Sequence, residues 1–149
     1  MDVQLRQAEP ADYDRIITVA DEWWGRPVSA ILPRLWLDHF FRTSLIAEEA
    51  GSLAGFLVGL LSDSDPEAAY IHFLGVAPQL RGAGLARRLY NRFFTLAEAD
   101  GRSHVRAVTS PQNATSIAFH AAMGFTVTGP VAGYDGPGVD RIVFHRSLS

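Results

Sequence analysis

A glycine-bearing turn between an apolar strand and a helical segment constrains this chain more than any other feature. Residues 70–74 have the composition of a buried strand, and apolar side chains recur at helical spacing over residues 85–97. Between them, Gly82 and Gly84 carry no Cβ, so the backbone can take positive φ and a ligand can approach it closely. A turn that opens a helix directs several backbone N–H groups toward one point, at the positive end of the helix dipole. We therefore predict a phosphate site here, with Arg81 placed to pair with the phosphate charge.

Two common phosphate-binding motifs do not fit this turn. A P-loop needs a Lys followed by Ser or Thr after its last glycine, whereas Leu85 and Ala86 follow Gly84. A dinucleotide-binding fingerprint needs a third glycine at the position of Arg87 and an acidic residue about 20 residues further on, at the end of a second strand. The sequence meets neither condition.

A third motif fits this turn at every defined position. Gln79–Gly84 reads Gln-Leu-Arg-Gly-Ala-Gly, which matches the turn Gln/Arg-x-x-Gly-x-Gly/Ala, and the flanking Leu74–Pro78 and Leu85–Ala86 are also typical of it. A second stretch, Asn113–Phe125, has an Asn, a helical segment and a closing Gly-Phe at matching spacing. In both stretches the chain resembles the GNAT acyltransferases. The resemblance extends over nearly the whole chain and is most specific in these two stretches.

The expected order of elements is β α α β β β α β α β β. Interleaved helices and strands predict an α/β fold with a mixed sheet, and the resemblance implies the GNAT fold, with about seven strands flanked by about four helices. We expect strands at residues 3–5, 44–48, 53–61, 70–74, 105–108, 125–128 and 141–145. We expect helices from residue 9 to the break at 21–27, at 32–41, from 85 to the turn at 100–101, and at 113–123 with Asn113 as its cap. By length, residues 1–149 form a single domain.

The resemblance implies acetyl-CoA as the co-substrate. In the family the glycine turn holds the pyrophosphate, and the Asn helps to hold the pantetheine arm. A backbone N–H near Leu74 or Val76 is expected to hold the thioester oxygen as charge develops on it. The expected acetyl-CoA-binding residues are Leu74, Val76, Arg81, Gly82, Ala83, Gly84, Leu85, Ala86, Asn113 and Phe119.

The acid of the reaction is predicted at His120. In the family a Tyr at this position stands near the thioester sulfur and can protonate the departing thiolate, and this chain has His120 instead. A His can donate a proton and exists in both forms near neutral pH. The alternative is a helix residue that only packs or caps, and the sequence leaves both interpretations open.

The base of the reaction is predicted among three residues. A lysine-like amine has a pKa near 10.4, so it needs a base or a water chain to become a nucleophile. In many relatives a Glu on or near the central strand has this role, but residues 70–74 contain no Glu, and His72 is their ionisable residue. Glu49 or Glu48, at the end of a neighbouring strand, is the other candidate. The alternatives are a satisfied core histidine and a solvated turn charge.

The acceptor-binding residues are predicted from aromatic side chains in elements that the family places around the acceptor. These candidates are Trp23, Trp24, Tyr70 and Tyr134, although most such residues are also suited to the core. The loop at residues 134–138 either closes over the acceptor or is only a long hairpin.

Composition excludes several classes of function. The chain has no cysteine, which excludes disulfides, thiolate metal sites and a cysteine acyl-enzyme, so direct attack by the acceptor is the simpler mechanism. Its five His residues lie far apart without ligand spacing, so we expect no metal. A net charge of −3 argues against nucleic-acid binding, and no apolar run reaches the length of a membrane span. The first residues lack a signal pattern, so we expect a cytoplasmic protein. Exposed last strands in the GNAT fold often pair in dimers, and by this analogy the sequence leaves both a monomer and a homodimer open.

Three hypotheses about function follow. The first is an acetyl-CoA-dependent N-acetyltransferase that moves an acetyl group directly to a primary amine of a small molecule or peptide in a ternary complex. The second is an acyl-CoA-binding regulatory module with little or no turnover, suggested by the missing Tyr at His120 and the missing central Glu. The third keeps the phosphate site but uses a different acceptor or a longer acyl chain.

Overall fold

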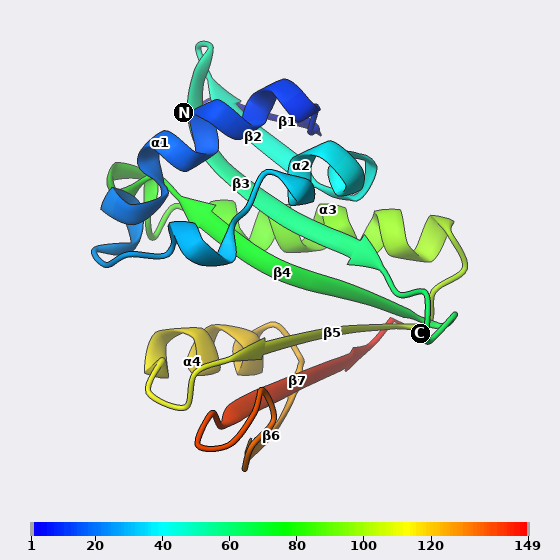
Figure 1. Cartoon of the computed structure of the whole chain (residues 1–149). Coiled ribbons are helices and arrows are strands. Elements are labelled where there is room, and N and C mark those ends of the chain that lie inside the picture. The colour runs from blue at the N-terminus through cyan, green and yellow to red at the C-terminus, as the bar shows by residue number, and fades with distance from the viewer. Residues whose placement is uncertain (1, 149) are drawn as a thin grey trace. The chain divides into compact units, whose positions relative to one another are not determined.

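A computed structural model describes residues 2–148 and contains a seven-stranded mixed sheet with four α-helices, which confirms the predicted fold class (Figure 1). The strand order is β1-β2-β3-β4-β5-β7-β6. The strands are β1 (Val3–Gln7), β2 (Leu45–Glu49), β3 (Ser52–Leu61), β4 (Ala68–Val76), β5 (His104–Thr109), β6 (Thr126–Val131) and β7 (Arg141–Ser147). The helices are α1 (Tyr13–Trp24), α2 (Leu35–Phe40), α3 (Leu85–Ala99) and α4 (Ala114–Ala122), and four 3-10 turns are η1 (Pro10–Asp12), η2 (Ser29–Ile31), η3 (Phe41–Thr43) and η4 (Pro78–Leu80).

The chain divides into two compact units. The first consists of residues 1–60 and 71–96, and the second of residues 61–70 and 97–149. Strand β4 contributes to both, because its first residues, Ala68–Tyr70, pair in parallel with His104–Arg106 of β5 inside the second unit. The expectation of a single domain stays a prediction.

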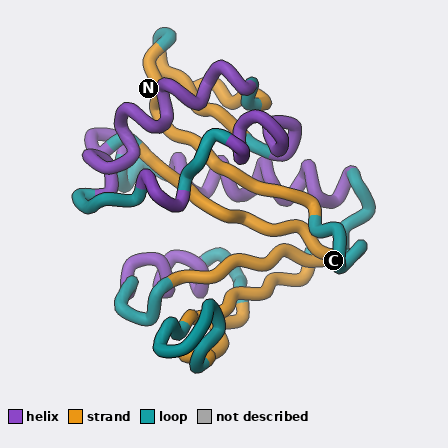
Figure 2. The backbone as a smooth tube through the Cα atoms, viewed as in Figure 1, coloured by secondary structure: helices purple, strands orange, loops and turns teal. Residues whose placement is uncertain are grey.

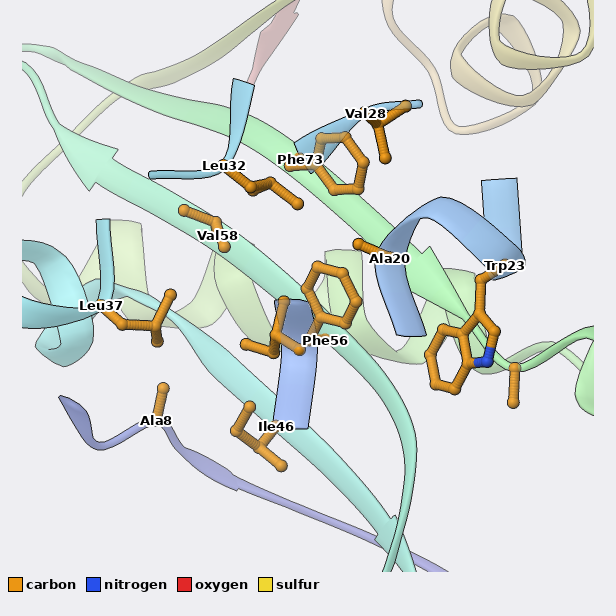
Figure 3. Close-up of a cluster of buried hydrophobic side chains, with 12 residues drawn as sticks. Ala8, Ala20, Trp23, Val28, Leu32, Leu37, Ile46, Phe56, Val58 and Phe73 are labelled. Atoms are coloured by element: carbon orange, nitrogen blue, oxygen red, sulfur yellow. The ribbon is translucent and has the colours of Figure 1, made fainter. Parts of the chain in front are cut away.

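The first unit packs α1 and α2 against one face of its strands and α3 against the other (Figures 1 and 2). Phe56 of β3 lies at the centre of the α1–α2 side, where its ring stacks on Phe73 of β4 and on Trp23 of α1, with centroids 5.9 and 6.2 Å apart (Figure 3). The other face is tight, because a Cβ at Gly59 of β3 would overlap the ring of Phe93 in α3. The β3 backbone therefore lies close to α3 at this glycine.

Two helical segments differ from the sequence prediction. Helix α1 runs through Trp24 instead of breaking at residue 21, and it ends at Gly25, whose φ is 69°. The Asp21 carboxylate does not interrupt the helix, because it turns away and accepts hydrogen bonds from the amides of Val28 and Ser29, both at 2.8 Å. Helix α2 is shorter than predicted and lies between the 3-10 turns η2 and η3.

A network of charges joins β1, β2 and α1 in the first unit. Arg6 bonds Asp12 at 2.8 Å and Glu48 at 3.0 Å, and Arg15 bonds Glu48 at 2.8 Å. Burial alone would raise the pKa of Asp12, but hydrogen bonds from Arg6 and from the Glu9 amide, with the nearby positive charges, hold that pKa below its usual value. The carboxylates in this network therefore stay ionised and tie the edge of the sheet to the start of α1.

The second unit packs α4 against one face of β5 and β7. Strand β7 is antiparallel to both β5 and β6. On the face covered by α4, the ring of His120 from α4 stacks on Phe144 of β7. The loop between β6 and β7 is held at its base, where the Asp140 carboxylate accepts from the Gly133 amide at 3.0 Å. Within residues 2–148, none of the helices is long and apolar enough to cross a membrane.

Candidate functional site

The predicted phosphate turn lies at the N-terminus of α3, and backbone hydrogen bonds hold the residues that precede it in place. The amide of Ala77, just after β4, donates to the Ala54 carbonyl of β3 at 2.9 Å and fixes the end of the strand. The 3-10 turn η4 follows, in which the Leu80 amide donates to the Ala77 carbonyl at 2.9 Å. Leu85, the first residue of α3, is buried in the core and anchors the start of the helix.

The geometry of this turn fits a phosphate group. Gly82 and Gly84 have φ of 84° and 82°, and no atom lies within 4 Å of where a Cβ would stand at either position. The backbone is therefore open on that side. The Arg88 amide donates to the Gly84 carbonyl at 3.1 Å as the helical pattern begins, so the amides just before Arg88 are first-turn donors that have no acceptor within the helix. These donors and the helix dipole favour an anion at this point.

Arg81 takes part in the anchoring of the turn. One of its guanidinium nitrogens donates to the Trp23 carbonyl at the C-terminal end of α1. A guanidinium has five N–H donors, so this contact fixes the side chain while other donors remain for an anion. Its role in phosphate binding stays a prediction, as do those of Ala83 in the turn, of Ala86 in the first turn of α3, and of the half-buried Leu74 and Val76 in β4.

His72 of β4 is held by two contacts in the first unit. Its Nε2 lies 2.6 Å from the Ile31 carbonyl of η2, and its ring stacks on Trp36 of α2 with centroids 4.1 Å apart. Because a carbonyl only accepts, Nε2 carries the proton and Nδ1 has the lone pair in the neutral ring. Burial lowers the pKa of His72 below its usual value, and the bond to Ile31 opposes this only in part. The neutral form, which can accept a proton, is favoured at neutral pH.

The two glutamates at the end of β2 differ in their surroundings. Glu48 is bound by Arg6 and Arg15, and these hydrogen bonds lower its pKa, so its carboxylate has a structural partner. Glu49 pairs across the sheet with Val3 and Ser52 and is half-buried. The role of Glu49 as a base stays a prediction.

Asn113 caps α4 in the second unit, as the sequence predicts. Its Oδ1 accepts from the Ser116 amide at 3.1 Å, and its Nδ2 donates to the Thr109 hydroxyl at 3.2 Å. The side chain is thus oriented from both sides at the start of the helix. Contact with a pantetheine arm stays a prediction, as does the cofactor role of half-buried Phe119.

His120 is buried between aromatic rings. It stacks on Phe144 with centroids 3.9 Å apart and planes at 3°, and its Nδ1 lies 2.8 Å from the Ser116 carbonyl. Nδ1 therefore carries the proton of the neutral ring. Burial lowers the pKa of His120 below its usual value, with the bond to Ser116 opposing it. Both features favour a neutral, packed ring at neutral pH, and the acid role stays a prediction.

The four aromatic candidates for the acceptor site fall into two groups. Trp23 stacks on Phe56, and Trp24 packs on Phe73 with centroids 4.8 Å apart, so both tryptophans pack against sheet residues in the first unit. Tyr70 and the exposed Tyr134 belong to the second unit, where burial first, and then Tyr134 and Asp135, raise the pKa of Tyr70 to about 12. Acceptor binding by these residues stays a prediction.

Several polar groups near the candidates escaped the sequence analysis. The Ile31 carbonyl, which orients His72, is a backbone group and has no sequence signal. Arg141 reads as the first residue of a strand, and only the structure pairs it with Asp135. Among residues 2–148, no three His, Asp or Glu side chains are arranged to hold a metal ion.

A sequence model of the Acetyltransferase (GNAT) family matches residues 10–125. The chain belongs to this family. An L-2,4-diaminobutyric acid acetyltransferase from Nocardia farcinica is 30% identical to this GNAT chain over 89 residues, which are 60% of the chain and 46% of the relative. Another from Halomonas elongata is 31% identical over 114 residues, 75% of the chain and 59% of the relative. The chain spans about half the length of the curated relatives it matches.

A solved structure extends the comparison of this GNAT chain to nearly its whole length. The diaminobutyrate acetyltransferase from Paenibacillus lautus, in complex with L-2,4-diaminobutyric acid and coenzyme A, superposes with a TM-score of 0.76 at 21% identity. The match covers 99% of this chain and 95% of that one. At this identity the likeness concerns the fold.

The open side of Gly84 gives a direct test of the turn. We expect Gly84→Ala to weaken coenzyme A binding by about tenfold or more, because the added methyl stands where a phosphate would approach charge-assisted backbone donors. The matched control is Gly101→Ala after α3, where φ is 79° and a Cβ also meets no atom within 4 Å. Both variants should lose about 1 kcal/mol of stability from the left-handed backbone. Equal coenzyme A affinity of the two variants by titration calorimetry would contradict the assignment.

Proposed function

We propose that this chain is an acetyl-CoA-dependent N-acetyltransferase that transfers the acetyl group directly to a primary amine of a small molecule or peptide. The observation that carries the proposal is the open glycine turn at the N-terminus of α3. It lies within a chain of the GNAT family, whose matched relatives are named as acetyltransferases. Acetyl-CoA fits as the donor because its pyrophosphate needs the backbone donors and positive dipole that the turn offers.

Acetyl-CoA supplies the thioester, whose C–S bond breaks as a C–N bond to the amine forms. The amine arrives as an ammonium ion and loses two protons in all. One of them goes to solvent through a base, and the other ends on the sulfur of the released thiol. In this proposal the turn amides and Arg81 bind the pyrophosphate. The two protons are transferred elsewhere in the site.

His72 is proposed as the base that takes the first proton. Its Nδ1 has the lone pair, because Nε2 donates to the Ile31 carbonyl. The indole of Trp36 stacks on the imidazole and fixes its orientation. The lowered pKa keeps this lone pair available at neutral pH, although it also makes His72 a weaker base. A ring that is oriented by a carbonyl and a stacked indole is pre-set in one tautomer, which supports the assignment.

The experiment that tests the proposal measures thiol release from acetyl-CoA with a panel of amines. L-2,4-diaminobutyrate comes first, because the relatives are named for it. Simple alkylamines and short peptides with a free N-terminus follow. We expect release above hydrolysis for at least one amine, with an acetylated product by mass, and a clear loss in Gly84→Ala. Acetyl-CoA binding without release for any amine would favour the binding-module alternative instead.

The pH dependence of kcat/KM tests His72. A base works in its neutral form, so activity should fall as pH drops through its pKa, which burial places below about 6.5. His72→Gln keeps a donor for the Ile31 carbonyl but cannot take a proton. It should lose this acid limb and reduce kcat/KM at pH 7 by about a hundredfold. His39→Gln, an exposed histidine of α2, should leave the profile unchanged. An acid limb that survives in His72→Gln rules this base out.

A further inference from the structure

An ion pair at the junction of the β6–β7 loop and β7 has unused hydrogen-bonding capacity. Arg141 Nε donates to Asp135 Oδ2 at 2.7 Å, and Arg141 Nη1 donates to the Asp140 carbonyl at 3.3 Å. Within residues 2–148, Asp135 Oδ1 and Arg141 Nη2 make no hydrogen bond. A negative acceptor and a positive donor therefore lie side by side, on an exposed Asp135 side chain (47%) and a half-buried Arg141 side chain (31%).

The backbone fixes the position of this pair. The Asp135 amide donates to the Val139 carbonyl at 3.1 Å, and the Asp140 carboxylate accepts from the Gly133 amide. Arg141 begins β7, which pairs with β5. The loop that carries Asp135 is thus closed on itself and on the strand that carries its partner, so the two charges are held in place before any ligand arrives.

Tyr70 lies on the same face of the second unit's strands as Arg141. Tyr70 is in register with Arg106, which faces His145, and Arg141 is four residues before His145 on β7. The opposite face of β7 carries Phe144 and the ring of His120 from α4. Side chains on a strand alternate between faces, so Tyr70 and Arg141 stand on the face away from α4.

The Tyr70 hydroxyl is a further unused donor. Tyr70 is half-buried, and within the described part of the chain its hydroxyl makes no hydrogen bond. Its pKa is raised first by burial and then by Tyr134 and Asp135, while Arg141 lowers it, so all three groups are within electrostatic reach of the phenol. A half-buried phenol without a partner, beside an ion pair with spare groups, has the features of a polar ligand site.

We propose that Asp135 and Arg141, with the Tyr70 and Tyr134 hydroxyls, bind the zwitterionic head of an amino-acid acceptor. The inference rests on the proposed function and names its substrate class. The Asp135 carboxylate accepts from the α-ammonium group, and the Arg141 guanidinium donates to the carboxylate. The side-chain amine of the same molecule is then the group that is acetylated.

The charges of the site match this ligand. An amino-acid head carries one positive and one negative group close together, as the Asp135–Arg141 pair does in the reverse order. A partly exposed ion pair contributes little to stability, so sharing its charges with a ligand costs little. An amine that lacks the carboxylate cannot accept hydrogen bonds from Arg141. An acid that lacks the α-ammonium group cannot donate hydrogen bonds to Asp135. Such a site rejects ligands that lack a group it is built to bond.

Three matched amines test the inference. L-2,4-diaminobutyrate carries both head groups, 1,3-diaminopropane lacks the carboxylate, and 4-aminobutyrate lacks the α-ammonium. Binding to protein saturated with coenzyme A is measured by calorimetry, and turnover by thiol release from acetyl-CoA. We expect the complete amino acid to exceed each analogue by about tenfold or more in affinity and in kcat/KM, the loss of one charged hydrogen bond.

Two variants give a crossed pattern that a structural role would not produce. Asp135→Asn should weaken L-2,4-diaminobutyrate and 1,3-diaminopropane but not 4-aminobutyrate. Arg141→Gln should weaken L-2,4-diaminobutyrate and 4-aminobutyrate but not 1,3-diaminopropane. The matched control is Asp100→Asn, which removes an exposed partner of Arg102 in the same unit (3.1 Å) and should change none of the three.

The outcomes separate this inference from the proposed function. Turnover of all three amines without preference, or an equal loss for all three in both variants, overturns the head-group site while the transferase stands. The crossed pattern in binding, without thiol release, supports the site and contradicts the transferase. No binding and no release with any of the three overturns the inference as well.

Discussion

The first unit depends on how β4 passes into α3. The Ala77–Ala54 hydrogen bond ends the strand against β3, the buried Leu85 starts the helix, and Gly82 and Gly84 take the positive φ that this short connection requires. The same constraints leave the first-turn amides of α3 without acceptors in the helix, next to two glycines at which an added Cβ would meet no atom within 4 Å. The strand-to-helix connection and the predicted anion site therefore depend on the same residues, because the two glycines that make the turn add no side chain there.

Burial lowers the pKa of both candidate catalytic histidines, His72 and His120. His72 and His120 both lie against aromatic rings, each bonds a backbone carbonyl through one nitrogen, and burial lowers the pKa of each. They differ in what surrounds them. His72 meets the exposed turn at Ile31, whereas His120 is stacked inside the second unit on Phe144. Burial therefore favours the neutral ring at both positions, although the surroundings of the two rings differ. The catalytic role of each histidine stays a prediction.

The sequence was sufficient for the fold class, the order of the elements, the Asn113 cap and the glycine turn, because each depends on local pattern. The sequence did not predict features in which a side chain bonds a partner distant in the sequence. Residues 21–27 read as a break in the first helix, yet the helix continues through Trp24, and the Asp21 carboxylate accepts from the amides of Val28 and Ser29. The orientation of His72 by the Ile31 carbonyl and the pairing of Asp135 with Arg141 depend on tertiary contacts that spacing does not encode.

The melting temperature with and without acetyl-CoA tests the central claim most directly. If the turn at the N-terminus of α3 holds the pyrophosphate, ligand at about 100 times its Kd adds roughly 2.7 kcal/mol to the free energy of unfolding. For a chain of 149 residues this is a rise of several degrees. Adenosine, which has no phosphate group, should give no such rise. An unchanged melting temperature at millimolar acetyl-CoA would contradict the account.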